Sequence, residues 1–127
     1  MAKLSGGCLC GDVRYTLSAA PQHAVYCHCS MCRKSSGAPY TGWAVFALTA
    51  LKWTNAEPAE YKSSGAASRH HCRRCGGQIT WRTSKRPEFV AIAIGSLDTP
   101  DAVKPERHVF WADRVPGLEM EDGLPRS

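Results

Sequence analysis

Seven cysteines in three close groups constrain the fold of this chain more than any other feature of its sequence. The groups lie in residues 8–10, 27–32 and 72–75, and the middle group places three thiols within six residues. An odd count leaves one thiol over from a complete disulfide framework, and a disulfide inside a C-x-C pair would close a strained ring. Residues 1–7 lack the apolar core of a signal peptide, so we expect a reducing cytoplasm. Clustered cysteines in that compartment indicate metal ligands, with disulfides as the alternative.

The spacing of apolar residues and turn residues indicates one all-β domain. The 127 residues suffice for a single domain, residues 1–127, which can bury about two-thirds of its unfolded surface. Short alternating or apolar segments predict strands at residues 13–17, 23–26, 40–48, 78–82, 88–94 and 108–111. Segments 51–53 and 59–62 could pair as a hairpin, and the tail from residue 116 is expected to be irregular. No stretch has a sustained helical period, and no apolar run is long enough to span a bilayer, so no membrane partner is expected.

The two outer cysteine groups predict a closed zinc site. Cys72 and Cys75 are two residues apart and precede two glycines, a spacing in which a tight turn aims both sulfurs at one ion. Cys8 and Cys10 also precede a glycine and are the natural complement. Together the four thiolates would hold Zn²⁺ tetrahedrally and close a loop of more than sixty residues. Such a site is structural, since metal binding contributes on the order of 10 kcal/mol to folding in small zinc peptides.

The middle group leaves a second zinc ion one ligand short. Cys27, Cys29 and Cys32 have no fourth cysteine to complete a tetrahedral site. One reading is a second structural site completed by a histidine, with His28 a poor choice because it lies between two ligands and should point away. The better histidines are His23, His70, His71 and His108. The other reading is an open position for water or an incoming thiol, which is the arrangement of a catalytic zinc.

Positive charge follows the middle cysteine group directly. Three thiolates around Zn²⁺ carry a net negative charge that a fourth thiolate would double, so the site calls for cationic neighbours. Arg33 and Lys34 could supply that charge or bind the carboxylates of an anionic thiol, and an ordinary exposed loop is the plainer alternative. The formal net charge is +5, and basic residues concentrate from Arg69 to Arg86. That stretch could be a solvated face, an anionic small-molecule site or a nucleic-acid patch.

The order of these motifs resembles the glutathione-dependent formaldehyde-activating enzyme family. The resemblance covers nearly the full chain and is carried by residues 7–15, 27–39, 61–64, Arg69 with 72–76, 95–98, and Pro105 with His108. It implies a β-tent of small antiparallel sheets tied together by zinc. It also implies two zinc sites, of which the closed one is structural and the one at Cys27, Cys29 and Cys32 is catalytic or labile.

The reaction implied by this resemblance joins a small-molecule thiol to a small-molecule aldehyde. Glutathione would add to formaldehyde or a related small aldehyde and give S-(hydroxymethyl)glutathione, so the protein would be a zinc-dependent carbon–sulfur lyase. Cys27, Cys29 and Cys32 would then be the catalytic ligands, and Arg33 and Lys34 the residues that bind glutathione. No oligomeric state follows from the sequence.

Two other functions remain open at this point. The same domain type resembles that of centromere protein V, a chromatin-associated protein, so the chain could be a non-catalytic zinc-binding module that contacts nucleic acid or protein. The residues contacting phosphates would then be Arg69, Arg73, Arg74, Arg82, Lys85 and Arg86. The chain has no separate basic tail, so nucleic acid is not the expected partner. A purely structural two-zinc domain is the third reading.

Overall fold

The computed structural model describes residues 3–127, so the first two residues of the expected domain, and of the segment compared with a signal peptide, lie outside the described residues. The strands are β1 (Leu4–Gly7), β2 (Arg14–Leu17), β3 (His23–Cys27), β4 (Thr41–Ala47), β5 (Leu51–Trp53), β6 (Ala59–Lys62), β7 (Ala67–His71), β8 (Gln78–Thr83), β9 (Phe89–Ala93) and β10 (His108–Val109). The helical segments are α1 (Ser30–Ser36) and four single 3-10 turns: η1 (Leu48–Ala50), η2 (Ile94–Ser96), η3 (Pro100–Ala102) and η4 (Trp111–Asp113). The chain is therefore mostly strand with one short α-helix in its described part, which agrees with the all-β prediction.

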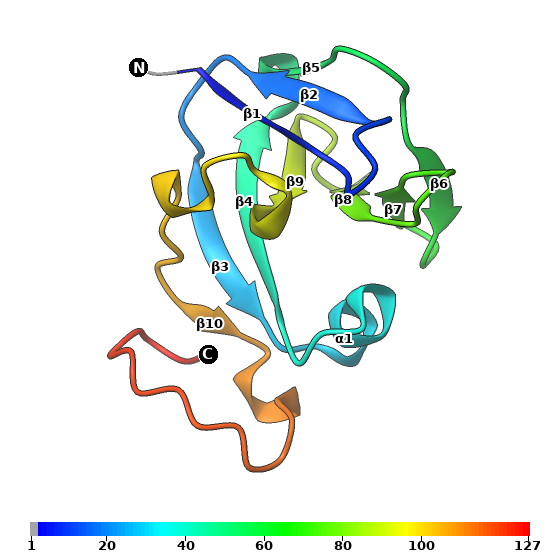
Figure 1. The fold of residues 1–127 in the computed structure, drawn as a ribbon. Coiled ribbons are helices and arrows are strands. Elements are labelled where there is room, and N and C mark those ends of the chain that lie inside the picture. Colours follow the sequence, from blue (N-terminus) through cyan, green and yellow to red (C-terminus); the bar gives the residue numbers. More distant parts are fainter. Residues whose placement is uncertain (1–2) are drawn as a thin grey trace.

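The strands form two sheets that lie across each other (Figure 1). A three-stranded antiparallel sheet has the order β1-β2-β5, and a seven-stranded sheet has the order β10-β3-β4-β9-β8-β7-β6. The larger sheet is antiparallel except at its edge, where β10 runs parallel to β3. Figure 1 shows α1 beyond the end of β3 and the C-terminal segment folded back beside β10. No helix in residues 3–127 has the length and apolar character that crossing a membrane requires.

The hairpin expected between residues 51–53 and 59–62 does not form. Instead β5 pairs with β2, with Trp53 opposite Tyr15, and β6 pairs with β7. The physical reason is an aromatic contact: the Trp53 and Tyr15 rings meet edge to face with centroids 6.0 Å apart. Three further elements, β1, β7 and α1, were not predicted, because a glycine-rich strand, a polar strand and a helix of seven residues show too little periodicity.

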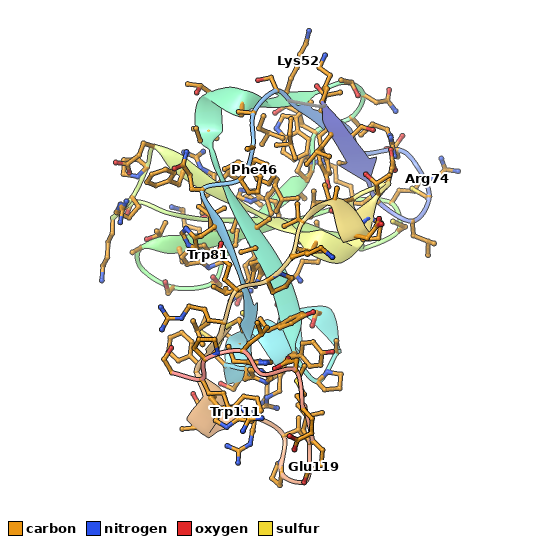
Figure 2. All side chains as sticks on the ribbon, turned by 90° about the vertical axis from the view of Figure 1, so that its left-hand side faces the viewer. Phe46, Lys52, Arg74, Trp81, Trp111 and Glu119 are labelled. Carbon is orange, nitrogen blue, oxygen red and sulfur yellow. The ribbon has the colours of Figure 1, made fainter. Side chains whose placement is uncertain are left out.

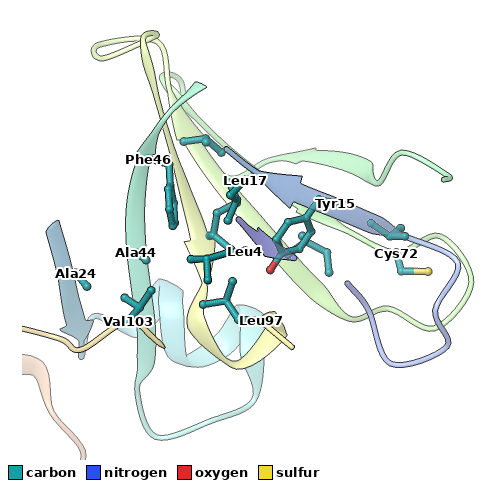
Figure 3. Packing of buried hydrophobic residues seen from close by; sticks show 13 residues of the cluster. Leu4, Tyr15, Leu17, Ala24, Ala44, Phe46, Cys72, Leu97 and Val103 are labelled. Carbon is teal, nitrogen blue, oxygen red and sulfur yellow. The ribbon is translucent and has the colours of Figure 1, made fainter. Parts of the chain in front are cut away.

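The main apolar core lies between the two sheets (Figure 3). Leu17 of β2 faces Ala44 and Phe46 of β4, all of them buried, and Figure 3 shows Leu4, Tyr15 and Leu97 in the same cluster. Because side chains alternate along a strand, Trp43 of β4 lies on the opposite face of the larger sheet. A second, smaller buried cluster forms there around Cys27 and Cys32, so the larger sheet separates the main core from these two sulfurs.

Residues 95–98, part of the family resemblance, fasten the smaller sheet to the larger one. The Tyr15 hydroxyl lies 2.7 Å from Ser96 Oγ. Arg14 donates two hydrogen bonds to the Asp98 carboxylate, at 3.0 and 2.6 Å, and Ser5 donates a third at 2.8 Å. These donors, Arg14 first, lower the pKa of Asp98 to about 2. Both contacts therefore depend on β1 and β2 lying close to this segment.

The close approach at Gly6 gives a test of that packing. A Cβ on Gly6 would lie inside contact distance of the Ser96 carbonyl oxygen and the Tyr15 hydroxyl, whereas a Cβ on Gly65 would meet no atom within 4 Å. We expect Gly6→Ala to lower the free energy of unfolding by about 1–3 kcal/mol, because overpacking displaces both partners. Gly65→Ala is the control and should change it little. Urea unfolding followed by circular dichroism measures both, and equal stabilities of the two variants would contradict the packing described.

Candidate metal and active site

Four cysteines from the two sheets meet at one point. Cys8 and Cys10 follow β1, while Cys72 and Cys75 lie in the turn between β7 and β8. Every pair of these Sγ atoms lies within 4.8 Å, with Cys8 and Cys10 3.6 Å apart and Cys10 and Cys72 3.8 Å apart. No disulfide links them, since all seven cysteines are free thiols. The pairing expected from the spacing is thus the one that the fold brings together.

The geometry of this four-cysteine cluster fits a tetrahedral zinc ion. With Zn–S bonds of about 2.3 Å, sulfur atoms in such a site lie about 3.8 Å apart. Backbone N–H groups also point at the sulfurs, from Val13 to Cys8 at 3.3 Å, and from Arg74 and Cys75 to Cys72 at 3.3 and 3.4 Å. These donors favour thiolates, the form in which cysteine binds a metal.

The other three cysteines lie where β3 passes into α1. Cys27 is the last residue of β3, and Cys29 is the N-cap of α1, with its Sγ accepting the Cys32 N–H at 3.3 Å. The first helical turn brings Cys32 back toward Cys27, so that their sulfurs lie 3.3 Å apart. All three Sγ atoms lie within 4.8 Å of one another. The unpredicted helix is therefore what assembles this three-cysteine cluster.

No histidine in residues 3–127 joins the three-cysteine cluster. His70 faces Glu60 at 3.6 Å, and His108 is hydrogen-bonded to His28. His23 and His71 line separate surface cavities. The described residues thus offer three donors, all of them thiols, and the reading in which a histidine completes a closed site is not supported by the geometry.

Two N–H donors single out Cys32 among the three thiols. Trp43 Nε1 donates to Cys32 Sγ at 3.4 Å, and the Arg69 guanidinium lies 3.7 and 3.8 Å from it. Both side chains are buried, so water does not screen these contacts. Hydrogen bonding with Cys27, the Trp43 N–H and the Arg69 cation together lower the pKa of Cys32 to about 5. The hydrogen bond with Cys32 and burial raise the pKa of Cys27.

Arg33 and Lys34, the cations expected beside the cluster because they follow Cys32 in the sequence, do not donate hydrogen bonds to its sulfurs in the described chain. Arg33 is half-buried and Lys34 is exposed. Arg69 of β7 takes that role although it lies 37 residues from Cys32. Sequence reasoning missed Arg69 and Trp43 as neighbours of Cys32, because only the pairing of β7, β8, β9 and β4 carries them to α1.

A cavity of about 520 Å³ lies between α1 and strands β6 to β8. Lys34, Arg69, His70 and His71 line it, and none of its lining residues is acidic. Ser35 of α1 reaches both sides of it, accepting from Arg69 at 3.1 Å and donating to Gln78 at 2.7 Å. Arg69 thus borders both the cavity and the Cys32 sulfur, and it gives the cavity a positive wall toward an anionic molecule.

The basic stretch is not one uniform surface. Arg69 is buried against Cys32, while Arg86 pairs with Glu88 at 3.7 Å and stacks on Phe89. The Arg82 guanidinium donates to the Pro87 carbonyl. Arg69 is therefore buried, whereas Arg73, Arg74, Lys85 and Arg86 are exposed, so the stretch is divided between one buried cation and an exposed basic edge.

Comparisons with known proteins agree with the motif resemblance. A family model described as glutathione-dependent formaldehyde-activating enzyme matches residues 3–113. A curated protein of Halomonas elongata, whose name provisionally describes it as such an enzyme, is 28% identical over 129 residues, which cover 93% of this chain and 81% of that protein. The crystal structure of a Rhodobacter sphaeroides protein superimposes with a TM-score of 0.61 at 20% identity, covering 97% of this chain and 99% of that one, and so has the same fold.

Serine substitutions should have different effects on folding and metal content in the two clusters. Cys72→Ser removes a buried thiol of the four-cysteine cluster, and we expect the protein to lose its cooperative fold, because zinc in such sites contributes on the order of 10 kcal/mol. Cys29→Ser should stay folded, since serine is also a good N-cap, and should lose one equivalent of metal. Metal content by mass spectrometry and thermal unfolding measure both. A folded Cys72→Ser protein, or full metal content in Cys29→Ser, would contradict this division.

Proposed function

The chain belongs to the glutathione-dependent formaldehyde-activating enzyme family, and from this premise we propose that it is a zinc-dependent carbon–sulfur lyase. It would add the thiol of glutathione to formaldehyde or a related small aldehyde. The observation that carries the proposal is the three-cysteine cluster, which offers three thiols and no fourth protein ligand within the described residues, beside a cavity with positive walls. We also propose that residues 1–127 form a single cytoplasmic domain, a β-tent that zinc ties together.

The proposal assigns different roles to the two cysteine clusters. Four thiols at tetrahedral spacing suit a structural Zn²⁺ that joins the two sheets. Cys27, Cys29 and Cys32 suit a second Zn²⁺, with these residues as its catalytic ligands. A zinc ion bound by three thiolates would act as a Lewis acid that keeps a coordinating thiol deprotonated near neutral pH.

The residues around the cluster set its charge. Three thiolates and one Zn²⁺ leave a net negative charge, and the buried Arg69 cation at Cys32 offsets it. The indole N–H of Trp43 can only donate a hydrogen bond, so it stabilises Cys32 as a thiolate. The buried indole ring also occupies the space that water would need on that side of the sulfur. Because both contacts lie in a buried cluster, each is stronger than it would be in water.

The cavity beside α1 suits the body of glutathione. Glutathione carries two carboxylates, and Lys34, Arg69 and two histidines face the cavity with no acidic residue among its lining. We assign Lys34, which lines the cavity, to a carboxylate, and Arg33, the preceding residue of α1, to a supporting role from outside the lining. Anchoring the carboxylates there would leave the thiol of the same molecule free to approach the three-cysteine cluster past Arg69.

The reaction itself balances without a further reactant. A lone pair of the sulfur forms the C–S bond to the carbonyl carbon, and the C=O π electrons move to the oxygen. The oxygen takes up one proton in place of the one that the thiol loses. The reverse reaction breaks the C–S bond and releases thiol and aldehyde, which is why the activity is that of a lyase.

A kinetic test uses matched lysine variants. We expect the zinc-loaded protein to accelerate exchange between formaldehyde and S-(hydroxymethyl)glutathione above the spontaneous rate, as measured by exchange NMR. Lys34→Gln should raise KM for glutathione about tenfold, the effect of one charge-assisted contact, and change kcat little. Lys52→Gln is the control, because Lys52 is exposed on β5 at the far end of the molecule (Figure 2).

Two outcomes of this test would sink the proposal. Exchange at the spontaneous rate with fully loaded protein would remove the lyase activity. Equal KM values for glutathione in the Lys34 and Lys52 variants would show that the cavity beside α1 does not bind the glutathione carboxylates. With cysteamine, a thiol that has no carboxylate, Lys34→Gln and the unchanged protein should give the same KM.

A further inference from the structure

A hydrogen-bonded chain of three side chains runs behind the three-cysteine cluster. His28 Nε2 lies 2.8 Å from His108 Nδ1, and His108 Nε2 lies 2.8 Å from Asp122 Oδ2. Both imidazole rings are fully buried, and Asp122 comes from the irregular C-terminal segment. A buried pair of histidines closed by a carboxylate is not needed to fill a β-sheet core, so its place beside the cysteines calls for a role.

The hydrogen bonds assign one tautomer to each ring. A carboxylate only accepts, so His108 Nε2 carries a proton and donates it to Asp122. In a neutral His108 the other nitrogen, Nδ1, then accepts, and His28 Nε2–H donates to it. The Asp122 carboxylate is held in turn by the Leu124 N–H, which donates to Oδ1 at 3.1 Å. The negative charge of Asp122 therefore fixes which atom donates and which accepts in both hydrogen bonds.

Aromatic packing keeps the two imidazole rings of this chain away from water, while the Asp122 side chain remains 30% exposed. The Trp111 ring meets the His28 and His108 rings edge to face, with centroids 4.9 and 4.8 Å away. The guanidinium groups of Arg114 and Arg126 lie 4.6 and 4.4 Å from the Trp111 ring. Figure 2 shows Trp111 at the end of the molecule where the C-terminal segment returns. The segment thus encloses the histidine pair as well as supplying Asp122.

His28 connects this chain directly to the thiols. It is the single residue between Cys27 and Cys29, and so joins the end of β3 to the N-cap of α1. Its backbone N–H donates to the Val109 carbonyl at 3.1 Å, while its ring is held by His108. With both its backbone and its ring fixed, His28 has one orientation, and the Cβ directions of the two flanking cysteines follow from it.

We propose that the His28–His108–Asp122 chain is a positioning device that sets the direction of the Cys27 and Cys29 sulfurs and thereby the metal affinity of the three-cysteine cluster. The proposal rests on the two-ion arrangement in the proposed function, but not on the reaction. His108 and Asp122 touch neither substrate nor metal, so they act on the site only through His28. The four-cysteine cluster, which this chain does not contact, is an internal control within the same molecule.

The sharpest variant is Asp122→Asn, which keeps the shape of the side chain. If the amide oxygen keeps the Leu124 N–H, the amide NH₂ faces His108 Nε2, which must then accept. Both tautomers reverse, and the proton on His28 moves to Nδ1, a buried atom with no partner in the described residues. Glu121→Gln removes the same charge from the neighbouring, exposed residue and is the matched control.

The experiment measures the two metal ions separately. Zinc release from the whole protein to a chromophoric chelator gives two dissociation constants, and Co²⁺ in the weaker site reports its ligand geometry through the visible d–d bands. We expect Asp122→Asn to raise the dissociation constant of the weaker ion about tenfold or more, the usual effect of an outer-shell partner, and to shift its Co²⁺ bands. The tighter ion should be unaffected, and Glu121→Gln should change neither ion. Imidazole ¹⁵N spectra should show the protonated nitrogen of His28 changing from Nε2 to Nδ1.

Each contrary outcome has a distinct meaning. If the unchanged protein binds only one ion, the proposed function fails and this inference fails with it. If it binds two ions and Asp122→Asn behaves like Glu121→Gln, the inference alone is overturned. The same holds if Asp122→Asn weakens both ions by the same factor, because that is a general loss of stability. Retention of the His28 Nε2 proton in Asp122→Asn would also overturn the tautomer argument.

Discussion

The meeting of four thiols at the junction of two sheets is the contact on which the rest of the structure depends. The turn after β1 belongs to the small sheet, and the turn between β7 and β8 belongs to the large one. Four sulfurs held within 4.8 Å would repel each other as thiolates, so the arrangement is favourable when a cation neutralises them. Closing this junction brings β2 over the large sheet, where Tyr15 and Leu17 bury their side chains against Phe46. In a chain this short, a cation bound at this junction would add to the stability that the core supplies.

The second cysteine cluster lies where β3 passes into α1 and has only three thiols, so its charge is balanced in a different way. Its negative charge is balanced from the side by Arg69, whose guanidinium touches both Cys32 and the wall of the neighbouring cavity. A cation at that point serves the thiols and borders the space where an anionic molecule would lie. The same residue therefore links the charge of the site to what the site can accept, which is consistent with membership of a glutathione-dependent family.

The C-terminal segment completes the site from behind. It has almost no regular structure, yet it pairs with β10, covers Trp111 and delivers Asp122 to His108. Hydrogen bonds of buried imidazoles have few alternatives, so they specify one arrangement more strictly than apolar contacts of the same size. The turn-rich tail is correctly predicted as irregular, but its contacts show that irregular backbone here holds Asp122 against the buried histidines beside the three-cysteine cluster.

The sequence by itself determined the features that depend on short spacing: the cysteine pairs at 8/10 and 72/75, the group of three at 27–32, the all-β character and the family. These could be predicted because residues two or three apart share a turn whatever the rest of the chain does. Only the tertiary structure decided which cation faces Cys32, where β5 pairs, and that Asp122 reaches His108. Those outcomes depend on strand order and register between distant segments, which are set by burial of whole sheet faces and leave no local pattern to read.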